Sequence, residues 1–292
     1  MSYKAAVAGL GSMGMGMAKS LLAANITTYG SDPDSSRLQE FVSAGGEQTN
    51  LTDAAGEIDC LMLVVVNANQ TRSVLSTVLE HLKKGAVVVS CATVPPEFAR
   101  EMESLCTDNG LLYLDAPISG GSVKAAAGAI TVLASGHNKA FKQAQPALDA
   151  VAEKVFTLGD SAGPGSALKS INQLLAGVHI AAAAEAITFG LSQGVDAKTT
   201  VEVISQCAGT SWMFENRGPH IADGDYTPHS AVDIFVKDLG IVCDIGHASK
   251  FPLPIAATAL QQFIAAAGAG LGREDDSAVA KVYANQSDIE LP

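Results

Sequence analysis

The chain has 292 residues, of which 48% are hydrophobic and 16% charged, and its formal net charge at pH 7 is -12. This length favours two domains over one small core, and the composition excludes a disordered chain. The negative charge disfavours nucleic acid and anionic membranes as partners, because both need clustered Lys and Arg. An anionic substrate would therefore need a local cationic pocket.

Neither the cysteines nor the apolar segments indicate export or a membrane. The five cysteines form no C-x-x-C pair and mostly sit in apolar runs, which is typical of buried reduced thiols. The N-terminus enters a strand-like segment without the charged region and cleavage site of a signal peptide. The apolar run Leu174–Ala184 is shorter than the roughly 20 residues that span a bilayer. We therefore expect a cytoplasmic protein without a membrane partner.

The first half of the chain alternates short β-branched runs with amphipathic stretches, which predicts a doubly wound, mostly parallel sheet covered by helices. The expected strands are Lys4–Ala8, Ile26–Gly30, Cys60–Val66, Ala86–Cys91, Leu111–Asp115, Thr131–Ser135 and Lys154–Leu158. The expected helices between them are Gly14–Ala24, Asp34–Ala44, Gln70–His81, Pro95–Thr107 and Asn138–Val151.

A break rich in Gly, Ser and Pro at 159–165 ends the strand signals. We expect one long helix after it, at about residues 165–193, which joins the two domains and is followed by shorter helices. Ala-rich helices pack closely, so this half is expected to be all-helical and to supply an oligomer contact. The predicted domains are an α/β domain over 1–162 and an all-helical domain over 163–292.

The run Gly9-x-Gly11-x-x-Gly14 follows an expected strand and opens an expected helix, which is the fingerprint of a dinucleotide-binding Rossmann domain. Gly9 permits the tight turn, Gly11 lets the backbone approach a pyrophosphate, and Gly14 lets the helix pack on the strand. The helix N-terminus offers N–H groups to the phosphates. The cofactor contacts expected in this loop are Gly9, Leu10, Gly11, Ser12, Met13 and Gly14.

Asp32 follows the second expected strand. A carboxylate here accepts hydrogen bonds from both ribose hydroxyls and repels a 2′-phosphate. Arg37 lies in the next helix rather than directly after the strand, so NAD is favoured over NADP. The alternative is that Asp32 only forms the turn before Pro33.

Lys169, near the start of the long helix, is the candidate acid or base. No Tyr has a Lys four residues on, and the six histidines show no metal-ligand spacing, so no metal site is predicted. The positive helix end and burial in a cleft both disfavour a charged amine, which suits a general base. Asn172 and Gln173 share its side of the helix and could orient a substrate. A solvated surface lysine is the alternative.

Four motifs resemble the β-hydroxyacid dehydrogenase family, which includes 3-hydroxyisobutyrate dehydrogenase, tartronate semialdehyde reductase and, more distantly, 6-phosphogluconate dehydrogenase. The motifs are Gly9–Ala18, Asp115–Gly121, Gly163–Gln173 and Lys237–Leu239. They occur in the family's order and together cover most of the chain.

The resemblance implies that Lys169 is the catalytic acid/base. It also implies a substrate-binding set in which a small anion nest holds the carboxylate: Ser119, Gly120, Gly121, Asn172 and Gln173. Further cofactor contacts are expected at Val65, Val66, Thr93 and Lys237. Two departures concern Gln173, which replaces the family's frequent Asn, and the strand end Ser90–Thr93, which keeps only Thr93.

Gly177–Glu185 and Ser211–Arg217 look like the L-threonate dehydrogenase branch, which acts on four-carbon sugar acids. That implies NAD-dependent oxidation of a small anionic hydroxy acid, L-threonate, at C2 to 2-dehydro-L-erythronate, by a homodimer or homotetramer. The alternatives are 3-hydroxyisobutyrate dehydrogenase, an aldehyde-acid reductase such as tartronate semialdehyde reductase, and a non-catalytic dinucleotide-binding protein. For Trp212–Phe214 and His179, core packing is the alternative to a role in the site.

Overall fold

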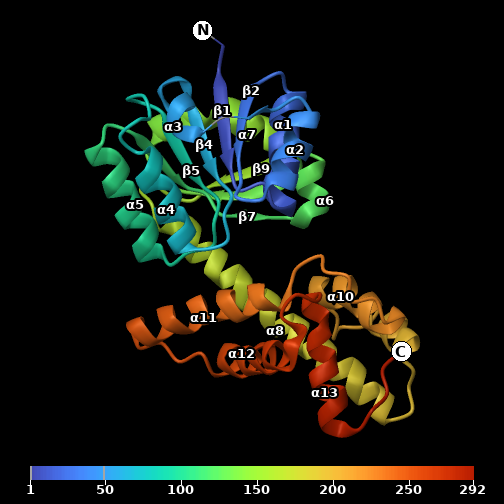
Figure 1. The fold of residues 1–292 in the computed structure, drawn as a ribbon. Coiled ribbons are helices and arrows are strands. Elements are labelled where there is room, and N and C mark those ends of the chain that lie inside the picture. Colours follow the sequence, from blue (N-terminus) through green and yellow to red (C-terminus); the bar gives the residue numbers. More distant parts are fainter. Residues whose placement is uncertain (1, 49) are drawn as a thin grey trace. The chain divides into compact units, whose positions relative to one another are not determined.

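In the computed structural model, which describes residues 2–48 and 50–292, the chain forms two units, Met1–Lys169 and Ser170–Pro292. Within the described part of the first unit, a parallel sheet of six strands has the order β3-β2-β1-β4-β5-β6 (Figure 1). Its strands are β1 (Lys4–Ala8), β2 (Thr27–Ser31), β3 (Glu47–Gln48), β4 (Cys60–Leu63), β5 (Val87–Ser90) and β6 (Leu112–Asp115). The predicted doubly wound sheet is confirmed.

Both faces of this sheet are buried, which explains why its strands are apolar almost throughout. Because side chains alternate along a strand, Ala5 and Val7 of β1 join one apolar cluster, and Ala6 and Ala8 join another. The first cluster includes α1 (Ser12–Ala23), α2 (Ser35–Ser43) and α7 (Asn138–Val151). The second includes α3 (Leu51–Ala54), η1 (Ala55–Glu57), α4 (Ala68–Val78) and α5 (Pro96–Asp108).

A second, smaller sheet corrects the prediction that all strands share one sheet. It consists of β7 (Ile118–Ser119), β8 (Ile130–Ala134) and β9 (Ala152–Thr157), with β8 parallel to β9 and antiparallel to β7. Asp115 joins the two sheets, because its backbone exchanges hydrogen bonds of 3.0 and 2.8 Å with Ser135. The helix α6 (Gly121–Ala126) follows β7 and packs against α1.

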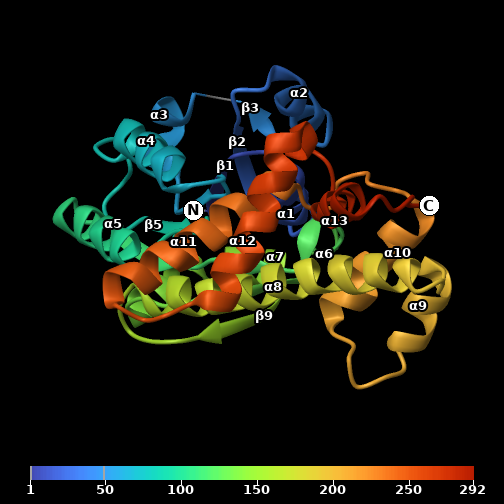
Figure 2. The same cartoon turned by 90° about the horizontal axis from the view of Figure 1, so that it is seen from below.

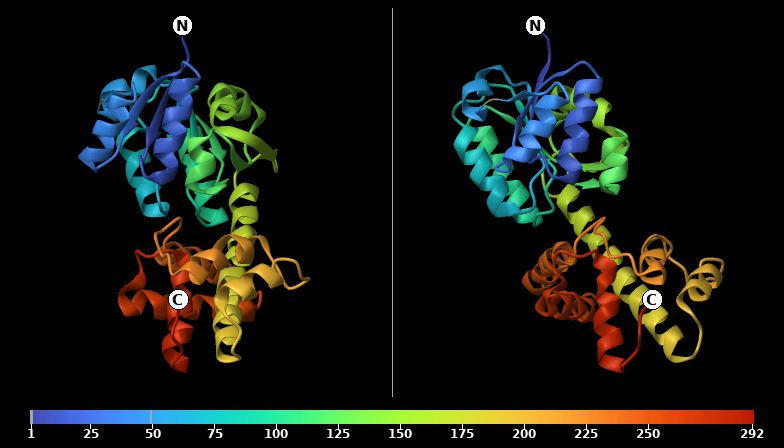
Figure 3. Two further views of the ribbon diagram at one scale, coloured as in Figure 1. Left: turned by 90° about the vertical axis from the view of Figure 1, so that its right-hand side faces the viewer. Right: turned by 45° about the vertical axis from the view of Figure 1, so that its right-hand side comes forward.

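The regular elements of the second unit are all helices, as predicted. The helix α8 (Pro164–Ser192) enters it and is unbroken in both views of Figure 3. The remaining helices, several of them labelled in Figure 2, are α9 (Ala197–Ile204), α10 (Trp212–Asp223), α11 (Val232–Ser249), α12 (Pro254–Ala266), η2 (Ala267–Leu271), η3 (Asp276–Val279) and α13 (Ala280–Ser287). Their core includes Ile180, Leu239 and a stacked pair, Phe235 and Phe263, with ring centroids 5.2 Å apart.

Two helices of this unit are long and apolar enough to cross a membrane by length and composition alone, Pro164–Ser192 and Pro254–Leu271. A core helix of a water-soluble protein meets the same criterion, and both helices supply side chains to the core of the second unit. They also expose apolar side chains, among them Phe189 at 65% and Ile255 at 68%. The second unit therefore keeps uncovered apolar surface.

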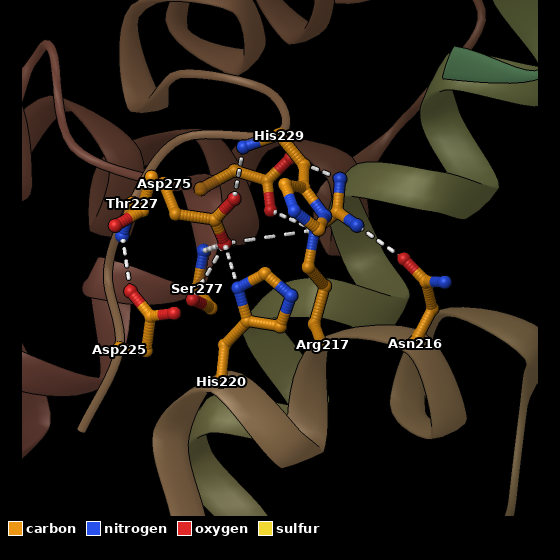
Figure 4. A network of polar contacts seen from close by, with 9 residues as sticks. Asn216, Arg217, His220, Asp225, Thr227, His229, Asp275 and Ser277 are labelled. Carbon is orange, nitrogen blue, oxygen red and sulfur yellow. Dashed lines mark hydrogen bonds and ion pairs between the residues drawn. The ribbon is translucent and has the colours of Figure 1, made fainter. Parts of the chain in front are cut away.

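A buried charge cluster ties α10 to the segment around η3 (Figure 4). The Arg217 guanidinium donates to Asp276 at 2.5 and 3.2 Å and lies 3.7 Å from Asp275. Both carboxylates have no exposed surface, and Arg217 is 8% exposed. His220 Nδ1 lies 3.4 Å from Asp275, whose carboxylate also accepts a 2.9 Å hydrogen bond from the His229 backbone. Arg217 thus has a structural role in the second unit.

The five cysteines are all unpaired thiols. Three are buried in the first unit, as predicted, and burial raises the pKa of one of them, Cys106, to about 12. These thiols stay protonated at neutral pH. Cys207 is exposed and Cys243 half-buried, so burial was the wrong prediction for those two.

Candidate active site

The predicted cofactor residues of the first unit lie where its parallel strands end. The Gly9 loop follows β1, Asp32 follows β2, Val65 and Val66 follow β4, and Thr93 follows β5. The carboxyl ends of parallel strands share one edge of the sheet, so these loops gather along that edge. The strand order reverses between β1 and β4, and open α/β sheets bind ligands at such a reversal.

The glycine loop has the geometry of a phosphate cradle. Gly9 has φ +96°, and a Cβ there would lie 2.4 Å from the Val64 carbonyl oxygen. A Cβ on Gly14 would lie 1.8 Å from the Gly9 carbonyl oxygen, so only glycine fits at either position. Gly11, the N-cap of α1, has no side chain to cap the helix, so the first turn presents its N–H groups outward.

A cavity of about 490 Å³ opens beside this loop. It is lined by glycine-loop residues, by charged residues of α1 and α2, and by residues of α6: Leu10, Gly11, Ser12, Lys19, Arg37 and Val123 among them. The free N–H groups, the close backbone approach and the adjacent cavity fit the phosphates of a dinucleotide.

Asp32 does form the turn after β2, and its contacts go further. Its carboxylate accepts hydrogen bonds from the backbone N–H groups of Leu10, at 2.7 Å, and Asp34, at 2.9 Å. A carboxylate has about four acceptor positions, so capacity for a ribose hydroxyl remains. Arg37, which the sequence places only in the next helix, reaches back to within 3.6 Å of Asp32. The carboxylate therefore links the glycine loop to the end of β2.

If Asp32 binds the ribose as the sequence predicts, replacing it with Ala is expected to raise the KM for NAD about 10- to 100-fold, because that hydrogen bond and the one from the Leu10 N–H are lost. The relative use of NADP should rise, since Arg37 loses its acidic neighbour. The control is Lys83→Ala, which should leave the KM for NAD unchanged, because Lys83 pairs with Asp59 before the first residues of β4 and β5, at the opposite edge of the sheet. Steady-state rates with each dinucleotide check this; an unchanged KM in Asp32→Ala would contradict the ribose assignment.

Lys169 is 8% exposed and belongs to the first unit, so the alternative of a solvated surface lysine is wrong. The turn expected to bind a carboxylate belongs to the same unit. Ser119 ends β7, and Gly120 and Gly121 open α6 with φ +135° and +74°, conformations that favour glycine. Ser119 is half-buried, whereas the two glycines are exposed.

In the second unit, three of the predicted residues form one polar network. The Gln173 amide donates to Asp238 at 2.5 Å and accepts a 2.9 Å hydrogen bond from Asn172. Lys237 is ion-paired with Asp238, which is 2% exposed. Sequence reasoning assigned no role to Asp238, although the motif Lys237–Leu239 contains it. The buried Asp238 carboxylate connects α8 to α11, because it accepts from Gln173 of α8 and pairs with its neighbour Lys237 of α11.

The aromatic cluster at the start of α10 divides between core and surface. Met213 and Phe214 are 9% and 4% exposed, as core packing predicts. Trp212 is 68% exposed, so core packing is wrong for it. His179 is half-buried on α8.

Comparison with protein-family models matches both units. Residues 4–159 match the NAD binding domain of 6-phosphogluconate dehydrogenase. Residues 163–283 match a domain described as NAD-binding of NADP-dependent 3-hydroxyisobutyrate dehydrogenase. These two matches together cover most of the chain.

Individual relatives agree with the family models. The chain is 49% identical over 296 residues to L-threonate dehydrogenase of Cupriavidus necator, covering 100% of this chain and 99% of the relative. It is 48% identical over 295 residues to L-threonate dehydrogenase of Escherichia coli, covering 99% and 97%. A crystal structure of 3-hydroxyisobutyrate dehydrogenase from Salmonella typhimurium superposes with a TM-score of 0.91 at 48% identity, covering 96% of this chain and 100% of that one.

Proposed function

Because the chain belongs to the 3-hydroxyisobutyrate dehydrogenase family of NAD-dependent hydroxyacid dehydrogenases, we propose that it oxidises L-threonate at C2 to 2-dehydro-L-erythronate. The observation that carries the choice of substrate is the identity of nearly half to L-threonate dehydrogenases along the whole chain. The arrangement of the first unit supports the chemistry, since it combines a phosphate cradle, an exposed glycine turn and a buried lysine.

In the proposed reaction, Lys169 accepts the proton of the C2 hydroxyl as general base. The Ser119 hydroxyl and the backbone N–H groups of Gly120 and Gly121 hold the substrate carboxylate. NAD, when held by the glycine loop, supplies the acceptor for the hydride that leaves C2. Asn172, on the helix of Lys169, orients the substrate hydroxyls.

Gln173 is proposed to bind substrate together with Asn172. It donates one amide N–H to Asp238 and accepts a hydrogen bond from Asn172, so it can orient the Asn172 side chain, and its amide has a second N–H. Lys237, ion-paired with the same carboxylate, is proposed to contact the cofactor.

A panel of hydroxy acids tests the substrate. L-threonate should give the highest kcat/KM for NAD reduction, above 3-hydroxyisobutyrate and glycerate. 3-Hydroxyisobutyrate is the second candidate substrate, because a crystal structure described as 3-hydroxyisobutyrate dehydrogenase superposes on this chain at 48% identity. A higher kcat/KM with 3-hydroxyisobutyrate would reject L-threonate as the substrate but keep the reaction class. NAD binding without turnover of any hydroxy acid would reject the enzyme itself.

A homodimer or homotetramer in the cytoplasm is the proposed state of the protein. The support is the uncovered apolar surface of the second unit, including Phe189, Ile255 and Ile264, exposed by 65%, 68% and 42%. Light scattering should give a mass of two or four chains. Phe189→Asp should lower that mass if α8 lies in the contact, and a monomeric wild-type protein would contradict the proposal.

A further inference from the structure

The start of helix α8 is held by one buried carboxylate, that of Asp115 at the end of β6. Its Oδ2 accepts hydrogen bonds from the backbone N–H groups of Gly163, at 2.9 Å, and Ser166, at 2.8 Å. Its Oδ1 accepts a 2.6 Å hydrogen bond from the Ser166 hydroxyl. The Ser135 hydroxyl donates to Asp115 at 3.3 Å and accepts from the Gly165 N–H at 3.0 Å.

The side chains of Asp115 and Ser135 accept hydrogen bonds from the N–H groups at the start of α8. A helix leaves its first N–H groups without partners inside the helix. In α8 they belong to Gly163, Gly165 and Ser166, and each has a partner. Pro164 has no N–H, and the Ala167 N–H makes the first helical hydrogen bond, to Gly163 at 2.8 Å.

The group that holds the helix is itself fixed by both sheets. Asp115 pairs with Ser90 of β5 in the large sheet and bridges Ser135, which follows β8 in the small one. The helix approaches this junction closely, because a Cβ on Gly165 would lie 2.5 Å from the Leu133 carbonyl oxygen. The first turn of α8 is therefore tied to rigid strands.

Lys169 lies one turn beyond Ser166 on this anchored segment. Asp115 and Lys169 are both buried in the first unit, at 1% and 8% exposure. Side chains on a helix lean toward its N-terminus, which directs Lys169 toward the turn that Asp115 holds. Other titratable groups around this helix start come from α5 and β6: Arg100, Glu103, Cys106 and Tyr113.

The charge of Asp115 changes the electrostatics expected for Lys169. Burial raises the pKa of Asp115, and the hydrogen bonds from Ser166, Gly163 and Ser135 oppose that rise. Two of its partners are backbone N–H groups, which can only donate, and such hydrogen bonds favour the ionised carboxylate. In its ionised form, Asp115 places a negative charge at the positive end of α8 and offsets the dipole that alone would disfavour a charged lysine.

We propose that Asp115 is the positioning residue of Lys169: it holds the first turn of α8 against both sheets, so that the amine keeps one place relative to the cofactor loops. Its negative charge also stabilises the protonated amine, which is the state that Lys169 reaches after it takes the substrate proton. This inference rests on the proposed function, because it presumes that Lys169 is the general base.

The test is the variant Asp115→Asn, which keeps the size of the side chain but removes its charge. We expect kcat to fall about 100-fold, because small displacements of a catalytic group have effects of this size. The acid limb of the pH profile of kcat/KM should move about one unit lower. The direction follows because loss of the negative charge disfavours the protonated amine, so the neutral base forms at lower pH. The KM for NAD should not change.

Two further variants make the test specific. Glu103→Gln removes a carboxylate that accepts a 3.0 Å hydrogen bond from the Ala162 N–H just before α8, and it should leave the acid limb in place. Ser166→Ala removes the 2.6 Å hydrogen bond but keeps the charge, so it should lower kcat without moving the limb. Ser166→Ala also tests the inference if Asp115→Asn does not fold, because an unchanged kcat in Ser166→Ala would then overturn it.

The outcomes separate this inference from the proposed function. If Lys169→Ala keeps its activity, both are overturned. The inference alone is overturned if activity depends on Lys169 but the folded Asp115→Asn variant behaves like Glu103→Gln. In that case its kcat equals that of Glu103→Gln and the acid limb of its pH profile does not move.

Discussion

Replacing Lys169 with Ala is expected to lower kcat for L-threonate about 100- to 10,000-fold, which is the range that general-base catalysis contributes. The amine is buried on a helix whose start is tied to the sheet, and no other residue is proposed to take the hydroxyl proton. The Kd for NAD should stay nearly constant, because the glycine loop and Asp32 are unaltered. Steady-state kinetics and calorimetric titration with NAD measure the two quantities.

A matched variant separates chemistry from packing. Lys169→Met keeps an unbranched side chain in the buried position but has no titratable group. It should lose as much activity as Lys169→Ala while unfolding at nearly the wild-type temperature. Activity within a few-fold of wild type in either variant would reject Lys169 as the base.

Replacing Arg217 with Met is expected to lower the free energy of unfolding by about 3–5 kcal/mol, the cost of leaving buried charges without their partner. Asp275 and Asp276 would both stay fully buried, and the 2.5 Å contact of the guanidinium with Asp276 would be lost. Burial already raises the pKa of Asp276, to about 6, against the opposing effect of Arg217, so Asp276 should become protonated in the variant. Urea unfolding measures the change.

The control for this variant is an ion pair at the surface of the same unit. Lys198 lies 3.0 Å from Asp223, with side chains exposed by 72% and 60%, and Lys198→Met should change stability little. If Arg217→Met lowers the free energy of unfolding no more than Lys198→Met does, the buried charge cluster does not stabilise the second unit.

Strands and helices with strong periodic patterns were predicted well from the sequence. The bounds of β1 (Lys4–Ala8) and α7 (Asn138–Val151) agree with the prediction, because each combines a clear apolar pattern with distinct ends. The strands β3 and β7 were missed, since two residues are too few to show alternation. The assignment of β8 and β9 to a separate sheet depends on tertiary pairing, which a local pattern does not contain.

The site was predicted residue by residue but not as a set of contacts. Sequence motifs identified Lys169 and the glycine loop. The glycines are required by the backbone conformation of the loop, and the lysine is suited to acid–base chemistry. The motif around Asp115 was attributed to its Ser and glycines alone, because the donors to its carboxylate come from positions 20, 48 and 51 residues away. The contact of Asp238 with Gln173 spans 65 residues and escaped prediction for the same reason.

The central claim is the oxidation of L-threonate at C2 with NAD, and its most direct measurement is identification of the product by nuclear magnetic resonance. Purified protein, L-threonate and NAD should give 2-dehydro-L-erythronate in equal amount to the NADH formed. A ketone at C3, or NADH formation that does not depend on L-threonate, would contradict the proposed function.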